Sequence, residues 1–246
     1  MKNSWETVTV DNSEMPLYLS QPDLPGPVPA IIVIQNKYGV KEFTQEMTRR
    51  CAEAGYVGIA PQLYHRTGEP ATEKEVENLR SARNDTNILA DLTGTIDFLK
   101  GCAKADMSRL AIVGFCMGGR VAFLAAAATP WFNAAVDYYG GRIYKAWGKD
   151  RPAPSELAAN VSCPIQGHFG MLDTGPSPEE MRKLDAELTQ HGKAHEFFYY
   201  DGAGHSFNNS GQKKYVPEAD KISWQRTLDF FAAHLATSAQ KKAASA

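Results

Sequence analysis

The sequence predicts an α/β fold with a mainly parallel central sheet and helices on both faces. Continuous apolar runs at 30–35 and 56–61 are typical of strands that are buried on both faces of a parallel sheet. Segments with the 3.6-residue spacing of amphipathic helices separate such runs along the chain. Strands that alternate with helices form a parallel sheet, because each crossover carries its helix across one face.

Length and composition predict a single domain over 1–246. The 246 residues are 43% hydrophobic, which suits one sizeable core, and the small, polar or basic residues 236–246 are expected to fray. The formal net charge of -2, with both signs interspersed, provides no basic face for nucleic acid and no polybasic patch for a membrane surface. We therefore expect a small-molecule substrate, whereas the oligomeric state, monomer or dimer, stays open.

The first residues lack the apolar core of a secretory signal peptide, and no later apolar run is long enough to span a bilayer. We therefore expect a cytoplasmic protein. The four cysteines form no CxxC pair and have no histidine partner at metal-ligand spacing. We expect no disulfide framework, no metal and no cofactor, and we assign Cys51, Cys102 and Cys163 to core packing.

The first hundred residues are predicted to contain four strands and three helices. Residues 6–10 and 17–20 have strand character with a turn between them, which indicates an antiparallel ribbon. The proline-rich connector 21–29 cannot join a sheet ladder and leads into the first buried strand. The buried strands are 30–35 and 56–61, and the helices are 43–54, 72–83 and 86–99.

The rest of the chain continues the alternation of strands and helices. The segment 140–160 is predicted to be a long loop, and long loops in compact α/β domains often cover active sites. The predicted strands are 110–114, 133–139, 164–169 and 195–200, and the predicted helices are 121–128, one that begins at Ser177 with Pro178 in its first position, and 219–235.

The most informative stretch joins an apolar strand to an Ala-rich helix through Gly-Phe-Cys116-Met-Gly-Gly. A strand, a tight Gly-x-nucleophile-x-Gly turn and a helix form a nucleophile elbow, which needs small residues at Gly114 and Gly118. The N–H groups at the start of the helix favour a thiolate and, beginning with Met117, can stabilise an oxyanion. We predict that Cys116 is the nucleophile. The alternative is a buried structural cysteine in a Gly-rich turn.

Two loops that follow later strands contain the other groups that a cysteine nucleophile needs. His205 can take the thiol proton and return it to the leaving group, and Asp173 can fix the tautomer of that imidazole and stabilise its cation. In a parallel sheet such loops gather beyond the carboxyl ends of the strands. The alternatives are that Asp173 caps a turn, that His205 is an ordinary loop histidine, and that Asp201 is the acid. The other histidines are assigned to surface or structural positions: His65, His168, His191, His195 and His234.

The chain order of nucleophile, acid and histidine is that of an α/β-hydrolase. Further motifs are Gly-Phe-Cys116-Met-Gly-Gly, the Asp173 loop, Ala203-Gly-His205-Ser-Phe, Tyr138-Tyr-Gly and Ala60-Pro-Gln-Leu-Tyr64. On these motifs the sequence resembles the dienelactone hydrolase family, the carboxymethylenebutenolidases, over about 31–231. The resemblance implies an α/β-hydrolase fold and hydrolysis of an enol-lactone or related activated ester through an acyl-enzyme on Cys116, assisted by His205 and Asp173. It also implies that the backbone N–H of Lys37 is the second oxyanion donor.

Two positions depart from the pattern of that family. The family has a glutamate after the glutamine that ends the first buried strand, where this chain has Asn36, which cannot accept a proton at neutral pH. We therefore predict that Cys116 depends on His205 and the helix terminus, and that the free enzyme has a larger thiolate fraction. The family also has a substrate-binding arginine shortly after the catalytic histidine, where this chain has Asn209. Arg120 is expected to form a structural ion pair. The candidate replacements for the arginine, each favoured as a solvated surface charge, are Lys37, Arg80, Arg83 and Arg142.

The side chains predicted to contact the substrate adjoin motif positions: Asn36, Tyr38, Tyr138, Phe207 and Asn209. Other aromatic residues near the motifs are assigned to the core: Tyr64, Phe115, Tyr144 and Trp147. Two other functions stay open. One is a broader carboxylesterase or thioesterase that is not specific for dienelactone, which Asn36 and Asn209 favour. The other is a non-catalytic relative that binds a small molecule.

Overall fold

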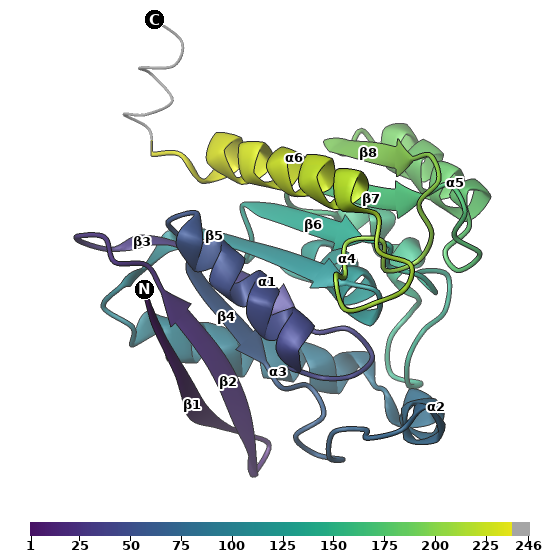
Figure 1. The fold of residues 1–246 in the computed structure, drawn as a ribbon. Helices are drawn as coiled ribbons and strands as arrows, with labels where there is room; N and C mark the ends of the chain where they lie inside the picture. The colour runs from purple at the N-terminus through teal and green to yellow at the C-terminus, as the bar shows by residue number, and fades with distance from the viewer. Residues whose placement is uncertain (238–246) are drawn as a thin grey trace, which may run out of the picture.

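A computed structural model describes residues 1–237, and an eight-stranded sheet runs through them in the order β1-β2-β4-β3-β5-β6-β7-β8 (Figure 1). From residue 238 on, the tail that is predicted to fray lies outside the described residues. The strands are β1 (Lys2–Val10), β2 (Ser13–Gln21), β3 (Val28–Ile34), β4 (Val57–Pro61), β5 (Ala105–Phe115), β6 (Ala134–Tyr138), β7 (Ile165–Gly170) and β8 (His195–Tyr200).

The sheet is mainly parallel, as predicted. β1 pairs antiparallel with β2 and β2 pairs antiparallel with β4, whereas every other neighbouring pair is parallel. Every residue of β4 and of β7 is buried, as expected for strands that are covered on both faces. Parallel pairing brings the carboxyl ends of the strands from β3 to β8 to one edge of the sheet, where functional loops gather in such folds.

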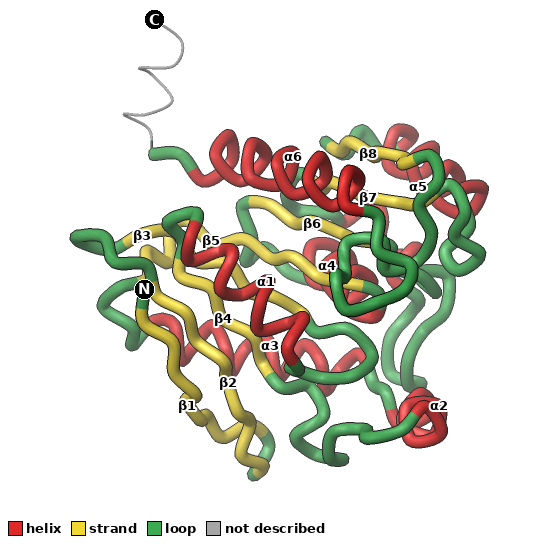
Figure 2. The backbone as a smooth tube through the Cα atoms, in the orientation of Figure 1, coloured by secondary structure: helices red, strands yellow, loops and turns green. Residues whose placement is uncertain are grey.

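Helices cover both faces of the sheet, which confirms the predicted architecture (Figures 1 and 2). Ile31 and Val33 of β3 belong to the core cluster under α1 and α6, whereas Ile32 and Ile34 belong to the cluster under α3, α4 and α5. This alternation follows from the two-residue period of a strand. The helices are α1 (Glu42–Glu53), α2 (Glu73–Ala82), α3 (Asp85–Lys100), α4 (Met117–Ala128), α5 (Pro178–Gln190) and α6 (Pro217–Leu235).

Two segments differ from the sequence-based prediction. The segment 140–160 is not a loop throughout, because Pro154–Asn160 forms a 3-10 helix, η1, whose Ala158 joins the core. A 3-10 helix has three residues per turn, so it leaves no 3.6-residue pattern in the sequence. β5 begins at Ala105 rather than at residue 110, because its polar first part pairs with the start of β3 across a register shift. Within residues 1–237, no helix combines the length and the apolar character that a membrane span requires.

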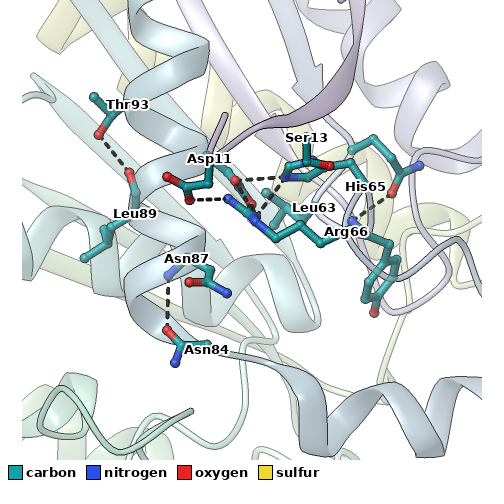
Figure 3. A network of polar contacts seen from close by, with 12 residues as sticks. Asp11, Ser13, Leu63, His65, Arg66, Asn84, Asn87, Leu89 and Thr93 are labelled. Atoms are coloured by element: carbon teal, nitrogen blue, oxygen red, sulfur yellow. Dashed lines mark hydrogen bonds and ion pairs between the residues drawn. The ribbon is translucent and has the colours of Figure 1, made fainter. Parts of the chain in front are cut away.

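A buried polar network fastens the N-terminal hairpin to α3 (Figure 3). The His65 ring lies between Ser13 Oγ, 3.0 Å from Nδ1, and Asp91 Oδ1, 3.0 Å from Nε2. Arg66 donates to Asp91 at 3.0 Å and to Asp11 at 2.8 Å. The side chains of His65 and Asp91 are 0% and 1% exposed, so His65 is structural, as predicted.

A second buried pair anchors α4. Arg120 donates to both carboxylate oxygens of Asp85, at 2.7 and 2.9 Å, and both side chains are completely buried. Arg120 also donates to the carbonyl oxygens of Arg142 and Lys145, and Asp85 accepts the backbone N–H of Trp147. The expected structural ion pair of Arg120 is thus confirmed. It ties the first turns of α3 and α4 to the segment after β6.

Candidate active site

Cys116 lies at the turn between β5 and α4 in a conformation that L-amino acids rarely adopt. Its φ is 58° and its ψ is -114°, which is strained for any residue other than glycine. A Cβ on Gly114 would overlap the carbonyl of Gly118, and a Cβ on Gly118 would overlap the carbonyl of Ile34. The need for glycine on either side of Cys116 is therefore steric, as the elbow motif predicts.

His205 and Asp173 come from the loops after β8 and β7, and His205 borders the same cavity as Cys116. His205 Nδ1 donates to Asp173 Oδ2 at 2.8 Å, and the Asp173 side chain is only 3% exposed. The other carboxylate oxygen of Asp173 accepts the N–H of Gly175 at 2.9 Å, so the carboxylate is held at both ends. Asp201, the alternative acid, is exposed, and it is Asp173 that receives the hydrogen bond from His205.

The thiol and the imidazole shift each other's pKa in opposite directions. Burial raises the pKa of Cys116, but the interaction with His205 and the backbone N–H of Met117 outweigh it, so the pKa lies below its ordinary value. Burial lowers the pKa of His205, but the hydrogen bond to Asp173 and the interaction with Cys116 raise it to about 10. Both shifts favour a thiolate beside an imidazolium at neutral pH.

Lys37, whose backbone N–H is the predicted second oxyanion donor, lies in a loop that two side chains hold. Tyr64 Oη donates to the carbonyl oxygen of Lys37 at 3.1 Å and lies 3.3 Å from Met117 Sδ. Glu73, at the start of α2, accepts from Lys37 Nζ at 2.8 Å and from the hydroxyl of Tyr38. Tyr64 therefore bridges the two residues whose N–H groups are the predicted oxyanion donors.

A cavity of about 370 Å³ borders Cys116 and His205, and most of the charged side chains that line it are cations. Four basic side chains line it, against the single carboxylate of Glu180: Lys37, Arg80, Arg83 and Arg142. All four were expected to be solvated surface charges; the structure places all of them on this cavity, and Arg142 is also exposed to solvent. We call this cavity the cationic arm.

Arg83 is the best positioned of these cations to meet a ligand. It lies over the Trp147 ring at 5.1 Å and donates from Nη2 to Tyr64 Oη at 3.1 Å. Its buried Nε has no hydrogen-bond partner within residues 1–237. This Nε is enclosed by the protein, so any contact with an anion in the cationic arm would be made by the part of the guanidinium that borders the cavity.

A second cavity, of about 150 Å³, also borders Cys116 and His205. Three of the predicted contact residues line it: Asn36, Tyr38 and Asn209. Asn36 and Asn209 are 9% and 8% exposed, so these amides are nearly enclosed. The structure therefore brings both departures from the family pattern to one place beside the Cys116–His205 pair.

Comparison with known proteins bears on this arrangement. Residues 15–235, most of the chain, match a family model described as the dienelactone hydrolase family. The chain belongs to the dienelactone hydrolase family.

Individual members of the dienelactone hydrolase family are similar over nearly their whole length. The chain is 35% identical over 233 residues to a "Putative carboxymethylenebutenolidase" of Yersinia pestis, covering 93% of this chain and 87% of that protein. It is 32% identical over 228 residues to a protein of the same name from Methylorubrum extorquens, covering 91% and 78%. The crystal structure of a "Putative Dienelactone Hydrolase" from Klebsiella pneumoniae matches with a TM-score of 0.86 at 31% identity, covering 94% and 98%. The chain is therefore a hydrolase with an α/β-hydrolase fold.

Two of the residues that were predicted to contact the substrate of this hydrolase do not reach the cleft. Tyr138 and Phe207 are both 0% exposed. Tyr138, the last residue of β6, packs against Phe115 and shares a hydrogen bond with Thr227 of α6. Nearness to a motif in sequence did not predict their placement. Tyr138 lies in a strand, where successive residues point to opposite faces of the sheet, whereas Phe207 lies in a loop and packs against Tyr139 and Tyr200. We therefore assign both to the core and correct the prediction.

Two core residues also border the site of this dienelactone hydrolase family member, which sequence reasoning did not predict. Trp147 and Tyr64 belong to the core, as predicted, but Trp147 also lines the cationic arm and Tyr64 supports the Lys37 loop. Arg80 and Arg83 lie three residues apart, which places neighbouring side chains on one face of a helix, and this spacing could have indicated a shared cationic surface.

A buried carboxylate beside the elbow was not predicted either. Asp137 of β6 is 2% exposed, and its Oδ1 accepts the N–H of Gly140 at 2.7 Å. Its Oδ2 has no hydrogen-bond partner in the part of the chain that is described, and burial raises the pKa of Asp137 to about 7. Within the same residues, no group of three or more His, Cys, Asp or Glu side chains is arranged to bind a metal ion.

Proposed function

We propose that the protein hydrolyses an activated ester or enol-lactone through a Cys116–His205–Asp173 triad. The observation that supports this most directly is the joint geometry of the three side chains. Cys116 occupies the strained elbow position, and the 2.8 Å bond from His205 to Asp173 orients an imidazole that borders the same cavity. A thiol, a base and an orienting carboxylate are the groups that nucleophilic acyl transfer requires.

The reaction begins from the thiolate–imidazolium pair. Cys116 Sγ attacks the acyl carbon, and the negative charge that develops on the carbonyl oxygen is stabilised by the backbone N–H groups of Met117 and Lys37. The bond between the acyl carbon and the leaving oxygen breaks, and the His205 imidazolium protonates that oxygen. Neutral His205 then takes a proton from water, which attacks the thioester and releases the acid and the thiolate. Good leaving groups suit this site, because a thiolate is itself easily expelled from the tetrahedral intermediate.

The cationic arm supports a substrate that carries a carboxylate. Arg80, Arg83 and Arg142 border one space beside Cys116 and His205. Guanidinium groups bind carboxylates with charge-assisted hydrogen bonds. These arginines would replace the family's arginine at the position of Asn209, so the carboxylate would lie in the cationic arm.

The proposal is tested by assaying the purified protein with cis- and trans-dienelactone and with p-nitrophenyl acetate, beside Cys116→Ala. We expect turnover of the lactones, no turnover by the variant, and an acyl adduct on Cys116 in intact-mass spectra of samples quenched with acid. If only p-nitrophenyl acetate is cleaved, and through Cys116, the substrate class is wrong although the triad holds. Full activity of Cys116→Ala would overturn the mechanism.

A broader carboxylesterase is the second candidate function. It is favoured by the uncharged amides of Asn36 and Asn209 in the second cavity, where the family has charged residues. The same assays separate the two candidates, because a broad esterase would accept simple esters at least as well as the lactones.

A further inference from the structure

Strained backbone is concentrated around the candidate site. Within residues 1–237, six residues other than glycine have a positive φ, and two of them form the turn between β1 and β2. Such a conformation persists only where the surrounding structure imposes it, which is common at functional sites. The other four line the site or contact it: Cys116 (58°), Tyr139 (43°), Arg142 (62°) and Ser206 (64°). Of these, Tyr139 has no part in the reaction described above.

The positive φ of Tyr139 changes the face on which its side chain lies. Successive residues of a strand point to opposite faces of the sheet. Tyr138 and Tyr139 nevertheless both belong to the core cluster under α1 and α6. The reason is that β6 ends at Tyr138 and the backbone turns at Tyr139. The turn therefore brings a second tyrosine ring to the side of the sheet where the loop after β8 lies.

Tyr139 contacts three residues of that loop. Its ring centroid lies 5.0 Å from that of His205, with 60° between the planes, and 5.5 Å from that of Phe207. Its hydroxyl donates to Asn208 Oδ1. Only 1% of Tyr139 is exposed, so its ring excludes water from one side of the imidazole. Tyr139 therefore supports both the ring of His205 and the segment that follows it.

The turn that carries Tyr139 is itself held by its neighbours. The Tyr139 N–H donates to the carbonyl oxygen of His168 in β7 at 2.9 Å, and the Gly140 N–H donates to Asp137 Oδ1 at 2.7 Å. A Cβ on Gly140 would overlap the backbone nitrogen of Arg120 and the carboxylate of Asp137, so glycine is required there for steric reasons. The buried carboxylate of Asp137 thus fixes the backbone that follows Tyr139.

The same short segment also contacts the nucleophile. The carbonyl oxygen of Tyr138 accepts the N–H of Cys116 at 2.9 Å. Two consecutive residues therefore contact the two reacting groups, Tyr138 through its backbone and Tyr139 through its ring. This arrangement fixes the position of the imidazole relative to the thiol, and acyl transfer is sensitive to that position.

We propose that Tyr139 is a positioning residue of the triad, whose ring and hydroxyl hold the His205 loop so that the imidazole stays within reach of Cys116. This inference rests on the proposed function. Tyr139 does not exchange a proton with the reacting groups, because its hydroxyl is engaged by Asn208 and burial raises its pKa well above the ordinary value. What it supports is the proton transfer by His205, first to the leaving oxygen and then from water.

Substitutions at both ends of the hydroxyl contact test the support of the loop. Tyr139→Phe and Asn208→Ala each remove the hydrogen bond, so we expect kcat for p-nitrophenyl acetate to fall about three- to tenfold, with KM within about twofold. The double variant should lose no more than the larger single effect, because all three variants lack the same interaction. Losses that multiply in the double variant, or a change confined to KM, would overturn the proposal.

Removal of the ring tests the contact with the imidazole. Tyr139→Met keeps a flexible apolar side chain in place of the ring. We expect kcat to fall at least about 30-fold, and Cys116 alkylation by iodoacetamide at pH 6.5 to slow at least about threefold, because a displaced imidazole stabilises the thiolate less. Tyr138→Phe is the matched control, since it breaks the buried bond to Thr227 and the ring contacts of Tyr138 within residues 1–237 do not include His205.

The control should keep both rates within about twofold of the unmodified protein. Equal losses in Tyr138→Phe and Tyr139→Phe would overturn the proposal, as would unchanged alkylation in a folded Tyr139→Met. Urea titrations establish that each variant is folded under the assay conditions, and if Tyr139→Met does not fold, the Tyr139→Phe and Asn208→Ala cycle decides. Alkylation needs no substrate. If the unmodified protein cleaves no ester, the proposed function fails, whereas the alkylation rates still support or overturn the role of Tyr139.

Discussion

Cys116 and His205 determine each other's protonation, and Asp173 orients the imidazole by accepting the hydrogen bond from His205 Nδ1. A thiol in an enclosed site would ordinarily resist ionisation. Here the charge of the imidazolium and the N–H of Met117 reverse that effect. Because residue 36 is an asparagine and not a glutamate, the stabilisation of the Cys116 thiolate is left to His205 and to the N-terminus of α4.

The first prediction concerns the pH dependence of Cys116 alkylation. Because its pKa is lowered, we expect the rate with iodoacetamide to fall less steeply from pH 8 to pH 6 than the roughly 80-fold loss of a thiol with a pKa near ~8.5. Peptide mass spectrometry gives the rate, with Cys102 in the same sample as the reference. His205→Ala should restore the steep profile. An equally steep profile in the unmodified protein would count against the ion pair.

The second prediction separates the two candidate acids. Asp173→Asn removes the charge that raises the pKa of His205, so we expect kcat to fall roughly 10²- to 10⁴-fold and the Cys116 alkylation profile to move to higher pH. Asp201→Asn is the matched control, because Asp201 is exposed and close in sequence to His205. Its activity should stay within about twofold. Inactivation by Asp201→Asn alone would show that the acid is misassigned.

The third prediction concerns stability and Asp137. Burial raises its pKa in the folded state to about 7, whereas an unfolded aspartate titrates near ~3.9. Between these pH values the folded protein binds more protons than the unfolded chain, so this group lowers the free energy of unfolding as pH rises. Asp137→Asn cannot ionise. In urea titrations, we expect the free energy of unfolding of this variant, relative to that of the unmodified protein, to increase by roughly 1–3 kcal/mol from pH 5 to pH 8. A difference that does not change with pH would refute this.

At the scale of elements, the Arg120–Asp85 pair decides how firmly α4 is held. Asp85→Asn leaves the Arg120 charge buried without its partner, and we expect the free energy of unfolding to fall by about 3–5 kcal/mol in urea titrations. Asp97→Asn on the same helix is the matched control. It breaks an exposed pair with Lys100, so the expected change is within about 0.5 kcal/mol. Equal losses of unfolding free energy in the two variants would show that the buried pair stabilises the fold no more than the exposed pair does.

The elements were predictable where the pattern of apolar residues is strong, and less so elsewhere. The run 30–35 became β3 and 56–61 became β4 with small changes of boundary, because buried parallel strands are apolar throughout. The polar start of β5 and the 3-10 helix Pro154–Asn160 have no such pattern. Their structure depends on a neighbouring strand and on α4, which only the folded chain supplies.

At the scale of the whole molecule, a Ser–His–Asp contact set lies outside the candidate active site. Ser13, His65 and Asp91 join the N-terminal hairpin to α3, and none of the described cavities is lined by Ser13 or His65. We expect Ser13→Ala to keep full esterase activity. We expect His65→Leu to keep its activity per folded molecule and to increase hydrogen exchange in β1 and β2. Loss of activity without faster exchange would contradict a purely structural role.

The candidate site was predictable only in part. Cys116, Asp173 and His205 stand in motifs whose chain order is informative. The structure brings Cys116 and His205 to one cavity, and His205 is bonded to the buried Asp173. The placement of Arg83 depends on how α2 and the following residues approach the cleft, which no local pattern encodes. The same holds for Phe207, whose burial is decided by the aromatic rings packed around it.

The attachment of α2 has a consequence for adaptation by mutation. Glu73 at its start holds Lys37 and Tyr38, and Arg80 in its last turn lines the cationic arm, with Arg83 directly after its end. One short helix and the residue after it therefore supply both the carboxylate that holds the Lys37 loop and two of the cations that line the cationic arm. A substitution that tilts or slides α2 changes both at once, so selectivity for charge and turnover number cannot be adjusted independently through this helix.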